Sequence, residues 1–555
     1  MPRTEQYDFI VVGAGSAGCV LADRLSVDGQ NKVLLIEAGG SDRSIFIQMP
    51  AALAYPMNTK RWNWGYNSEP EPHLNGRRLH CPRGLGLGGS SSINGLVYVR
   101  GNPLDFERWS NDEGARGWGY GDVLPYFKRA ETRAEGGNAY RGANGPLSTC
   151  YGTLKNPLNQ AWLDAAQQAG YDLTEDYNGF RQEGFGRMDM TVRNGTRCSA
   201  AKAYLYPARK RSNLTVVQHA LATRVLFEGK RAVGIEYERG GTLHQVRATR
   251  EVLLSGGSIN SVQLLKLSGI GPAKELKSLG IDVLADRPGV GANLQDHLEF
   301  YFQIACTKPV TLHGKANLLG KAMVGAQWLF LRRGIGASTQ FESCGFIRSK
   351  AGIKYPDIQY HFFPMAINYD GSSLATEHGF QAHVGPMRSK SRGTVTLKSK
   401  DPREHPKILF NYMSHPEDWT EMRACVRLTR EIFQQEAFAP WRGREIQPGA
   451  DCISEAAIDA FIADHVESAL HPSCTCKMGA VSDPMAVVDP ELKVIGVEGL
   501  RVIDSSVMPS ITTGNLNAPT IMIGEKGADH VLGKGLLAPS NAPYYVAPNW
   551  EAAQR

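Results

Sequence analysis

A glycine-rich turn near the N-terminus limits the fold more than any other feature. An apolar run over residues 8–12 leads into Gly13, Gly15 and Gly18, and a second apolar run, over residues 33–36, ends at Glu37. Glu37 lies 37 − 18 = 19 residues beyond the last glycine. This order of strand, glycine turn, helix, strand and acid is typical of a βαβ unit that binds a dinucleotide.

Each residue type in the turn has a physical role. Gly13 allows a sharp turn after the strand, Gly15 allows close approach to a pyrophosphate, and Gly18 allows the helix to pack on the sheet. The helix start at Ser16 offers free N–H groups and a positive dipole end. We expect Glu37, followed by Ala38, to accept hydrogen bonds from ribose hydroxyls.

Length, charge and cysteine content limit the possible classes of function. At 555 residues the chain is long enough for two or three domains. Its formal charge of +6 includes no basic block interleaved with aromatic residues, so we expect no nucleic-acid partner. Ten scattered cysteines and no apolar targeting segment favour the cytoplasm. Cys474 and Cys476 have no zinc-like partner pair, so we predict no metal site.

The apolar stretches are short. Ala322 to Leu331 is one of the longest and is far below the about 20 residues that cross a bilayer. We therefore expect at most peripheral membrane contact, with association at the inner membrane left open.

Three separated pieces predict one α/β unit. Besides the N-terminal unit, a strand near residues 251–255 meets Gly256 and Gly257 before a helix over 260–267, and a strand over 500–503 precedes Asp504 and a helix over 520–531. Residues 300–465 differ. Strand patterns over 357–363 and 394–398 and a helical pattern from Trp419 to Phe433 predict an antiparallel sheet backed by helices.

Four motifs carry a family resemblance: the N-terminal fingerprint, the stretch from Pro82 through Gly95, the run from Ser268 to Pro272, and His471 to Thr475 together with Asn515 to Asn517. With them the chain resembles the glucose-methanol-choline (GMC) oxidoreductases, from about residue 6 to residue 530. Within that family it is most similar to bacterial members that oxidise choline.

The resemblance implies a two-domain GMC fold of the α/β class, with a discontinuous Rossmann-like FAD-binding domain and a substrate-binding domain. The expected FAD-binding segments are 1–155, 196–298 and 466–535, the last carrying His471 and Asn515. The expected substrate-binding segments are 156–195 and 299–465, and 536–555 forms a C-terminal tail.

The resemblance also implies a set of FAD-binding residues. In some members a histidine follows the serine run and is joined covalently to the flavin, whereas this chain has Ile93 there, so we predict non-covalent FAD. Leu85 and Val262 replace residues that are usual in relatives. The predicted cofactor residues are Gly13, Gly15, Ser16, Gly18, Glu37, Ala38, Gly88, Gly89, Ser90, Asn94, Gly95, Val225, Asp504 and Asn517.

The predicted catalytic pair is His471 and Asn515. Oxidising an alcohol by hydride transfer needs a group that takes the hydroxyl proton, and we assign this to His471, which follows a helical pattern over 456–470 and is fixed by Pro472. Asn515 can donate to the developing alkoxide without competing for its proton. Many members have a second histidine there, so Asn515 favours a choline oxidiser.

A quaternary ammonium substrate needs a carboxylate and aromatic faces. By resemblance, Glu299 holds the trimethylammonium group, Trp62 and Phe341 form aromatic walls, and His361 binds the hydroxyl. Leu470 replaces one further wall ring.

The preferred function is oxidation of choline to betaine aldehyde, extended in principle to glycine betaine, with hydride transfer to flavin N5. The resemblance implies a quinone or a respiratory chain as electron acceptor. The alternative is a dehydrogenase of a neutral primary alcohol, aliphatic or polyether, and a more distant one is a flavin-containing lyase or non-redox member.

Overall fold

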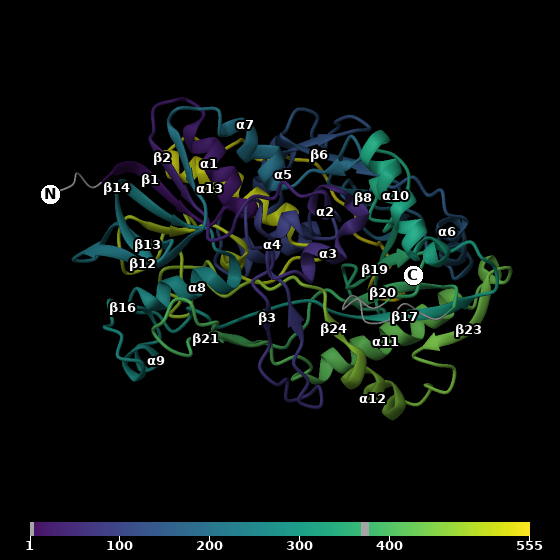
Figure 1. Cartoon of the computed structure of the whole chain (residues 1–555). Coiled ribbons are helices and arrows are strands. Elements are labelled where there is room, and N and C mark those ends of the chain that lie inside the picture. Colours follow the sequence, from purple (N-terminus) through teal and green to yellow (C-terminus); the bar gives the residue numbers. More distant parts are fainter. Residues whose placement is uncertain (1–4, 368–376) are drawn as a thin grey trace.

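The chain folds around two large sheets, as a computed structural model that describes residues 5–367 and 377–555 shows (Figure 1). In the first sheet, five strands run parallel in the order β11-β2-β1-β14-β25. Their bounds are β1 (Gln6–Val12), β2 (Val33–Ile36), β11 (Leu214–Val217), β14 (Thr242–Leu254) and β25 (Leu500–Val502). Because these strands come from three distant parts of the chain, the α/β unit is discontinuous, as predicted.

Burial explains why these strands form a parallel sheet. All four residues of β2 are buried, which is typical of strands covered on both faces. Helices α1 (Ser16–Ser26) and α13 (Asn517–Leu532) pack together above the strands, and α8 (Gly257–Leu267) lies below them (Figure 1). β14 extends beyond the parallel core and pairs antiparallel with β13 (Arg231–Arg239), which pairs with β12 (Ala220–Glu228).

The second sheet is antiparallel, in the order β23-β17-β20-β19-β18-β7. Its strands are β7 (Gly184–Arg187), β17 (Leu298–Cys306), β18 (Ser343–Ile347), β19 (Ile358–Phe363), β20 (Gly379–Pro386) and β23 (Arg442–Gln447). Helices α6 (Pro157–Gln168) and α11 (Pro416–Phe433) contact one face, where Trp162 stacks on Phe362 at 5.4 Å. Since side chains alternate along β19, Gln359 and His361 lie on the opposite face.

Shorter elements connect the two sheets. The remaining helices are α2 (Ile45–Gln48), α3 (Ala54–Met57), α4 (Pro103–Asn111), α5 (Tyr120–Ala130), α7 (Tyr206–Ala208), α9 (Ala273–Ser278), α10 (Leu318–Leu331) and α12 (Glu455–His465). The remaining strands are β3 (Tyr66–Asn67), β4 (His80–Cys81), β5 (Glu131–Arg133), β6 (Leu147–Tyr151), β8 (Asp189–Met190), β9 (Val192–Arg193), β10 (Thr196–Arg197), β15 (Ile270–Gly271), β16 (Ala285–Asp286), β21 (Thr394–Thr396), β22 (Lys407–Leu409) and β24 (Glu467–Ser468). None of the helices in the described part of the chain is both long and apolar enough to cross a bilayer.

The fold class is confirmed, and two local predictions are wrong. The helix expected over 456–470 ends at His465, because the following residues form β24 and pair with β17. The strand pattern near residue 394 forms a separate two-stranded sheet, β21 with β22, because its partner is the next strand along the chain. The domain boundaries stay a prediction, although β7, from segment 156–195, does join the second sheet.

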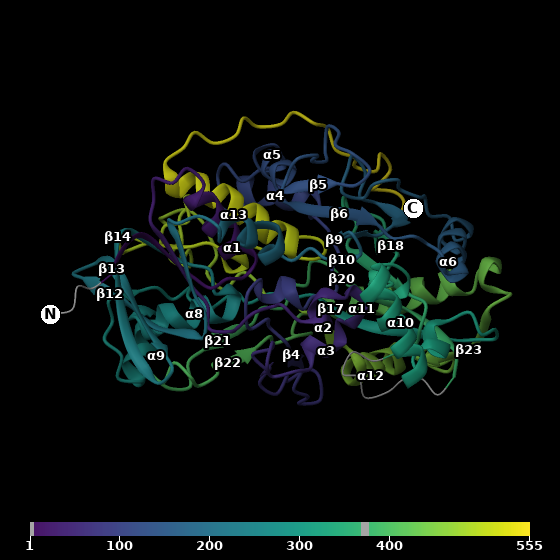
Figure 2. The same ribbon diagram turned by 45° about the horizontal axis from the view of Figure 1, so that its top comes forward.

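The C-terminal segment from residue 536 lies along the body of the protein (Figure 2). The backbone N–H of Tyr545 donates to the Phe180 carbonyl at 2.9 Å, and Arg348 donates to the Ala553 carbonyl at 2.7 Å. The tail therefore crosses from α13 to the antiparallel sheet.

Candidate active site

The glycine turn forms the floor of a large cavity between the sheets. Gly13 has a φ of +99°, and a Cβ atom there would meet the Ser255 carbonyl oxygen at 2.5 Å, so only glycine fits. A Cβ atom at Gly15 would have its nearest neighbour 3.9 Å away, and the residue lines the cavity. A Cβ at Gly18 would overlap the Gly13 carbonyl, so Gly18 serves the packing of α1.

The carboxylate of Glu37 joins three loops. It accepts backbone N–H bonds from Ala14 at 2.8 Å, Gly39 at 2.8 Å and Gly86 at 3.0 Å. Burial raises the pKa of Glu37, and these backbone donors act against that rise. A carboxylate has about four acceptor positions. A fourth backbone contact, from Ala38, also acts on this carboxylate, and Glu37 lines the cavity.

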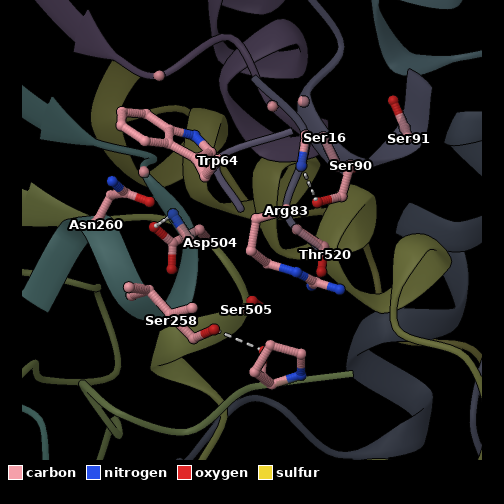
Figure 3. A pocket seen from close by; sticks show the side chains of 18 of the residues that line it. Ser16, Trp64, Arg83, Ser90, Ser91, Ser258, Asn260, Asp504, Ser505 and Thr520 are labelled. Carbon is pink, nitrogen blue, oxygen red and sulfur yellow. Dashed lines mark hydrogen bonds between the residues drawn. The ribbon is translucent and has the colours of Figure 1, made fainter. Parts of the chain in front are cut away.

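Most predicted cofactor residues line this cavity (Figure 3). They are Gly13, Gly15, Ser16, Glu37, Ala38, Gly89, Ser90, Asn94, Gly95, Asp504 and Asn517. Of the other three, Gly18 packs the helix, Gly88 takes a φ of +87° at the turn before Gly89, and Val225 is buried with its N–H on Ser268 Oγ at 2.9 Å. At the start of β12, Ala220, Leu221 and Ala222 line the cavity instead.

His471 and Asn515 lie side by side, as predicted. The Asn515 amide nitrogen is 3.0 Å from His471 Nε2, and both residues line the cavity. The amide is itself oriented by β19, because Gln359 Nε2 donates to Asn515 Oδ1 at 3.1 Å. His361 Nε2 is 3.3 Å from the same oxygen. Residues from three distant segments therefore meet at one point.

Hydrogen-bond partners fix the proton positions on His471. His297 Nε2 lies 3.0 Å from the Met387 carbonyl, which can only accept, so His297 carries its proton on Nε2. Its Nδ1 is then an acceptor, and His471 Nδ1, 3.0 Å away, donates to it. His471 Nε2 is left as an acceptor, which agrees with the Asn515 amide donating to it.

The pKa values agree with a neutral pair of imidazoles. Burial, reinforced by His297, His361 and Arg83, lowers the pKa of His471 well below its usual range. Burial also lowers the pKa of His297 to about 4. His471 is therefore a neutral base at physiological pH, with its lone pair on Nε2.

Asp296 holds the two histidines in place. Its Oδ1 accepts the backbone N–H groups of His297 at 2.9 Å and His471 at 2.7 Å. Its Oδ2 accepts the hydroxyls of Tyr412 at 2.6 Å and Ser468 at 2.5 Å. Burial raises the pKa of Asp296 to about 6. Asp296, His297 and Gln359 were not predicted as site residues, although the first two stand just before the predicted Glu299.

Glu299 is a buried carboxylate at the wall of the same cavity. His383 Nδ1 is 3.2 Å from its Oε1, and among the described residues no other basic group is within ion-pair distance. Gln381 presents its oxygen to Ile367 N and Gln303, so its amide N–H donates to His383 Nε2 at 2.7 Å and His383 Nδ1–H donates to Glu299. Among the residues that the structure describes, no Lys or Arg lies within ion-pair distance of the Glu299 carboxylate.

One aromatic ring, that of Phe341, lies beside the His383 partner of this carboxylate. The Phe341 ring lines the cavity and lies 5.2 Å from the His383 ring and 6.2 Å from the His361 ring. Trp62 packs on the apolar cluster that contains Phe341 but is not among the described residues that line the cavity, whereas Trp64 is. Leu470, which replaces one further wall ring, also lines the cavity.

A dinucleotide-binding sheet and a neutral histidine base that open on one cavity define a dinucleotide-dependent oxidoreductase. Comparison with known proteins narrows this class. Models of the GMC oxidoreductase family match residues 7–299 and 389–524. The chain belongs to the GMC oxidoreductase family.

Relatives match the whole chain. It is 60% identical over 550 residues to an oxygen-dependent choline dehydrogenase of Brucella ovis, and 59% identical to one of Sinorhizobium medicae, each match covering 99% of this chain and 100% of the relative. Among solved structures, pyridoxine 4-oxidase of Mesorbium loti superposes with a TM-score of 0.86 at 31% identity, covering 95% of this chain and 99% of the other. Formate oxidase of Aspergillus oryzae superposes with a TM-score of 0.90 at 26% identity, covering 95% and 98%.

FAD is the cofactor of this family, and the cavity fits it. A Cβ atom at Gly95 or Gly257 would meet no protein atom within 4 Å, so open space borders the backbone there. The N-termini of α1 and α13 both reach the cavity, and Ser16 Oγ donates to Asn517 Oδ1 at 2.8 Å between them. These N–H groups suit a pyrophosphate, and Glu37 suits a ribose hydroxyl.

Proposed function

We propose that this protein oxidises choline to betaine aldehyde, and the hydrated aldehyde to glycine betaine, with FAD held non-covalently. The buried carboxyl group of Glu299, which has no Lys or Arg partner among the described residues, carries the proposal. Burying an isolated carboxylate is costly unless a cation compensates it, and the trimethylammonium group of choline is such a cation. The choline-oxidising activity named for relatives that match the full length supports the same substrate.

His471 and Asn515 act on the substrate hydroxyl. The hydroxyl enters between His471 Nε2 and the Asn515 amide, now 3.0 Å apart, and replaces their direct contact. His471 Nε2 accepts the hydroxyl proton, and the Asn515 N–H donates to the oxygen as negative charge develops on it. His361 lies beside Asn515 and positions the same oxygen. Bound FAD supplies the acceptor for the hydride that leaves the carbinol carbon.

Glu299 and the rings position the other end of the substrate. The carboxylate attracts the cation, and the Phe341 face adds a cation–π contact of about 0.5 to 2 kcal/mol. Trp62, behind the lining residues, remains a predicted aromatic wall. Glu299 at the cation and the His471–Asn515 pair at the hydroxyl therefore fix the orientation of the molecule.

Ile93 supports dissociable FAD. It lines the cavity and is buried, and its side chain has no atom that can bond covalently to the flavin. Denaturing the yellow holoprotein releases all flavin into the supernatant if the proposal is correct, whereas flavin that stays with the precipitate contradicts it.

The central experiment is anaerobic mixing of the holoprotein with choline or with its neutral isostere, 3,3-dimethylbutan-1-ol. Choline should bleach the oxidised flavin band. Glu299→Gln should raise the choline concentration for half-maximal rate by roughly 30- to 1000-fold, since an ion pair near 4 Å is worth about 2 to 4 kcal/mol at this burial. Oxidation of the isostere should change little.

Glu421→Gln is the matched control, because burial already raises the pKa of Glu421 to about 8 and keeps it neutral. Equal losses on choline and on the isostere in Glu299→Gln would show that Glu299 does not bind the cation. Bleaching with neutral alcohols alone would support the alternative alcohol dehydrogenase, and no bleaching would support a lyase or non-redox member.

The electron acceptor is a separate proposal. We propose a quinone or a respiratory chain, whereas the relatives are named as oxygen-dependent. Oxygen uptake during choline turnover, compared with reduction of a soluble quinone, separates the two. Oxygen uptake that accounts for all turnover, with no gain in rate on adding quinone, refutes the quinone.

A further inference from the structure

Helix α10 (Leu318–Leu331) lies on the surface with apolar side chains facing outward. Only Gly320 and Trp328 of the helix are buried. Leu318, Leu319 and Phe330 are 86%, 70% and 80% exposed. A surface helix of a globular protein normally turns polar side chains to water, and a large exposed apolar patch marks an interaction site.

The exposed apolar area continues onto α2 and α3. Ile45, Phe46 and Tyr55 are exposed, and the Phe46 and Tyr55 rings lie 5.0 Å apart. The two regions adjoin, because a Cβ at Gly336 would contact both Trp328 of α10 and the Met49 sulfur beyond α2. Figures 1 and 2 both show α2, α3 and α10 as neighbours. We call the exposed side chains of α10 with Ile45, Phe46 and Tyr55 the apolar surface.

The chain segments that form the apolar surface are free of acidic residues. Residues 43–68 and 300–341 contain no Asp or Glu. The same segments contain eight basic residues: Arg43, Lys60, Arg61, Lys308, Lys315, Lys321, Arg332 and Arg333. Of these, Lys315, Lys321, Arg332 and Arg333 lie within or beside α10 itself and are exposed. An apolar face with a basic border matches the chemistry of an anionic lipid surface.

We propose that the apolar surface docks onto an anionic phospholipid bilayer, with α10 lying in the interface plane. The leucine and phenylalanine side chains enter the acyl boundary, and the basic residues contact lipid phosphates. Contact between two copies through this face brings two basic borders together, which like-charge repulsion opposes. Charge complementarity therefore favours lipid over a second copy.

Vesicle flotation of the purified holoprotein tests this docking without depending on the substrate. The expected result is binding to vesicles of phosphatidylcholine with phosphatidylglycerol, weak binding to phosphatidylcholine alone, and loss of binding as salt is raised. Leu319→Ser with Phe330→Ser should weaken binding at least tenfold. Lys321→Glu with Arg333→Glu should weaken it roughly 25-fold or more, because each basic residue near such a surface contributes roughly fivefold.

The matched control is Leu243→Ser with Ile453→Ser, two exposed apolar residues on other elements. This control should bind vesicles like the parent protein, and all variants should retain their flavin and the parent rate of choline oxidation with a soluble acceptor. Vesicle binding that survives both α10 variants overturns the proposal. A parent protein that ignores the anionic vesicles and forms a dimer dispersed by Leu319→Ser with Phe330→Ser also overturns it, in favour of a second copy as the occupant.

Discussion

Replacing His297 with alanine tests whether a neighbouring imidazole sets the proton position on the proposed base. The change removes the acceptor for His471 Nδ1–H, the buried His297 ring 3.0 Å away. An unpaired buried donor costs about 1 to 3 kcal/mol. If His297→Ala destabilises the reactive orientation of the His471 ring by this free energy, flavin reduction by choline slows by roughly 5- to 150-fold. The substrate concentration for half-maximal rate should change little, since Glu299 is untouched.

The pH profile gives a second readout. The positive charge that His297 takes on as pH falls through its own pKa of about 4 is, after burial, the largest cause that lowers the pKa of His471. Removing His297 should therefore raise the pKa of His471. On the acid side of the pH profile (its acid limb), the flavin-reduction rate should then begin to fall at a higher pH. A purely structural role for His297 lowers the rate but leaves the limb in place.

Stopped-flow measurement of anaerobic flavin reduction, across pH, provides both numbers. The matched control is His530→Ala, because burial lowers the pKa of His530 to about 4 as well, while its ring lies beside Trp118, away from the cavity. An unchanged rate and acid limb in His297→Ala would refute the hydrogen-bond directions deduced for the pair.

Three further predictions concern the same cavity. His471→Ala should slow flavin reduction by roughly 10²- to 10⁴-fold. In the parent protein the acid limb of the pH profile should lie below the usual histidine pKa, because the lowered pKa of His471 keeps the base neutral as pH falls. An acid limb near pH 7 contradicts this. Gly15→Val should abolish the yellow colour at an unchanged apoprotein melting temperature, because a Cβ there has space in the protein but lies at the cofactor cavity. The control Gly535→Ala, also in open space and with an ordinary φ, should keep the flavin. Asp296 has a pKa raised to about 6, so the stability it contributes is present at low pH and lost as pH rises through about 6. The melting temperature of Asp296→Asn should therefore improve relative to that of the parent between about pH 5 and about pH 8. The same difference in melting temperature between the two proteins at both pH values would contradict this.

The sequence by itself determined the local parts of this protein. Gly13 must be glycine because its backbone has a φ of +99° and an oxygen stands where a side chain would begin. The alternation along residues 358–363 puts His361 and Gln359 on one face and Phe362 on the other, since successive side chains of a strand point to opposite sides. Such constraints act between near neighbours in the chain, so they can be read without the fold.

Only the tertiary structure decided which residues from distant segments meet at the cavity. His297 and His471 are 174 residues apart, and their contact, which sets the proton position, depends on how β17 and β24 pair. The same pairing ended α12 at His465, where a helical pattern alone continued to residue 470. Packing of distant segments also puts Trp64 and Ala220–Ala222 at the cavity wall, which no local pattern indicated. Contacts between distant segments follow from packing of whole elements, and side-chain type at one position does not specify them.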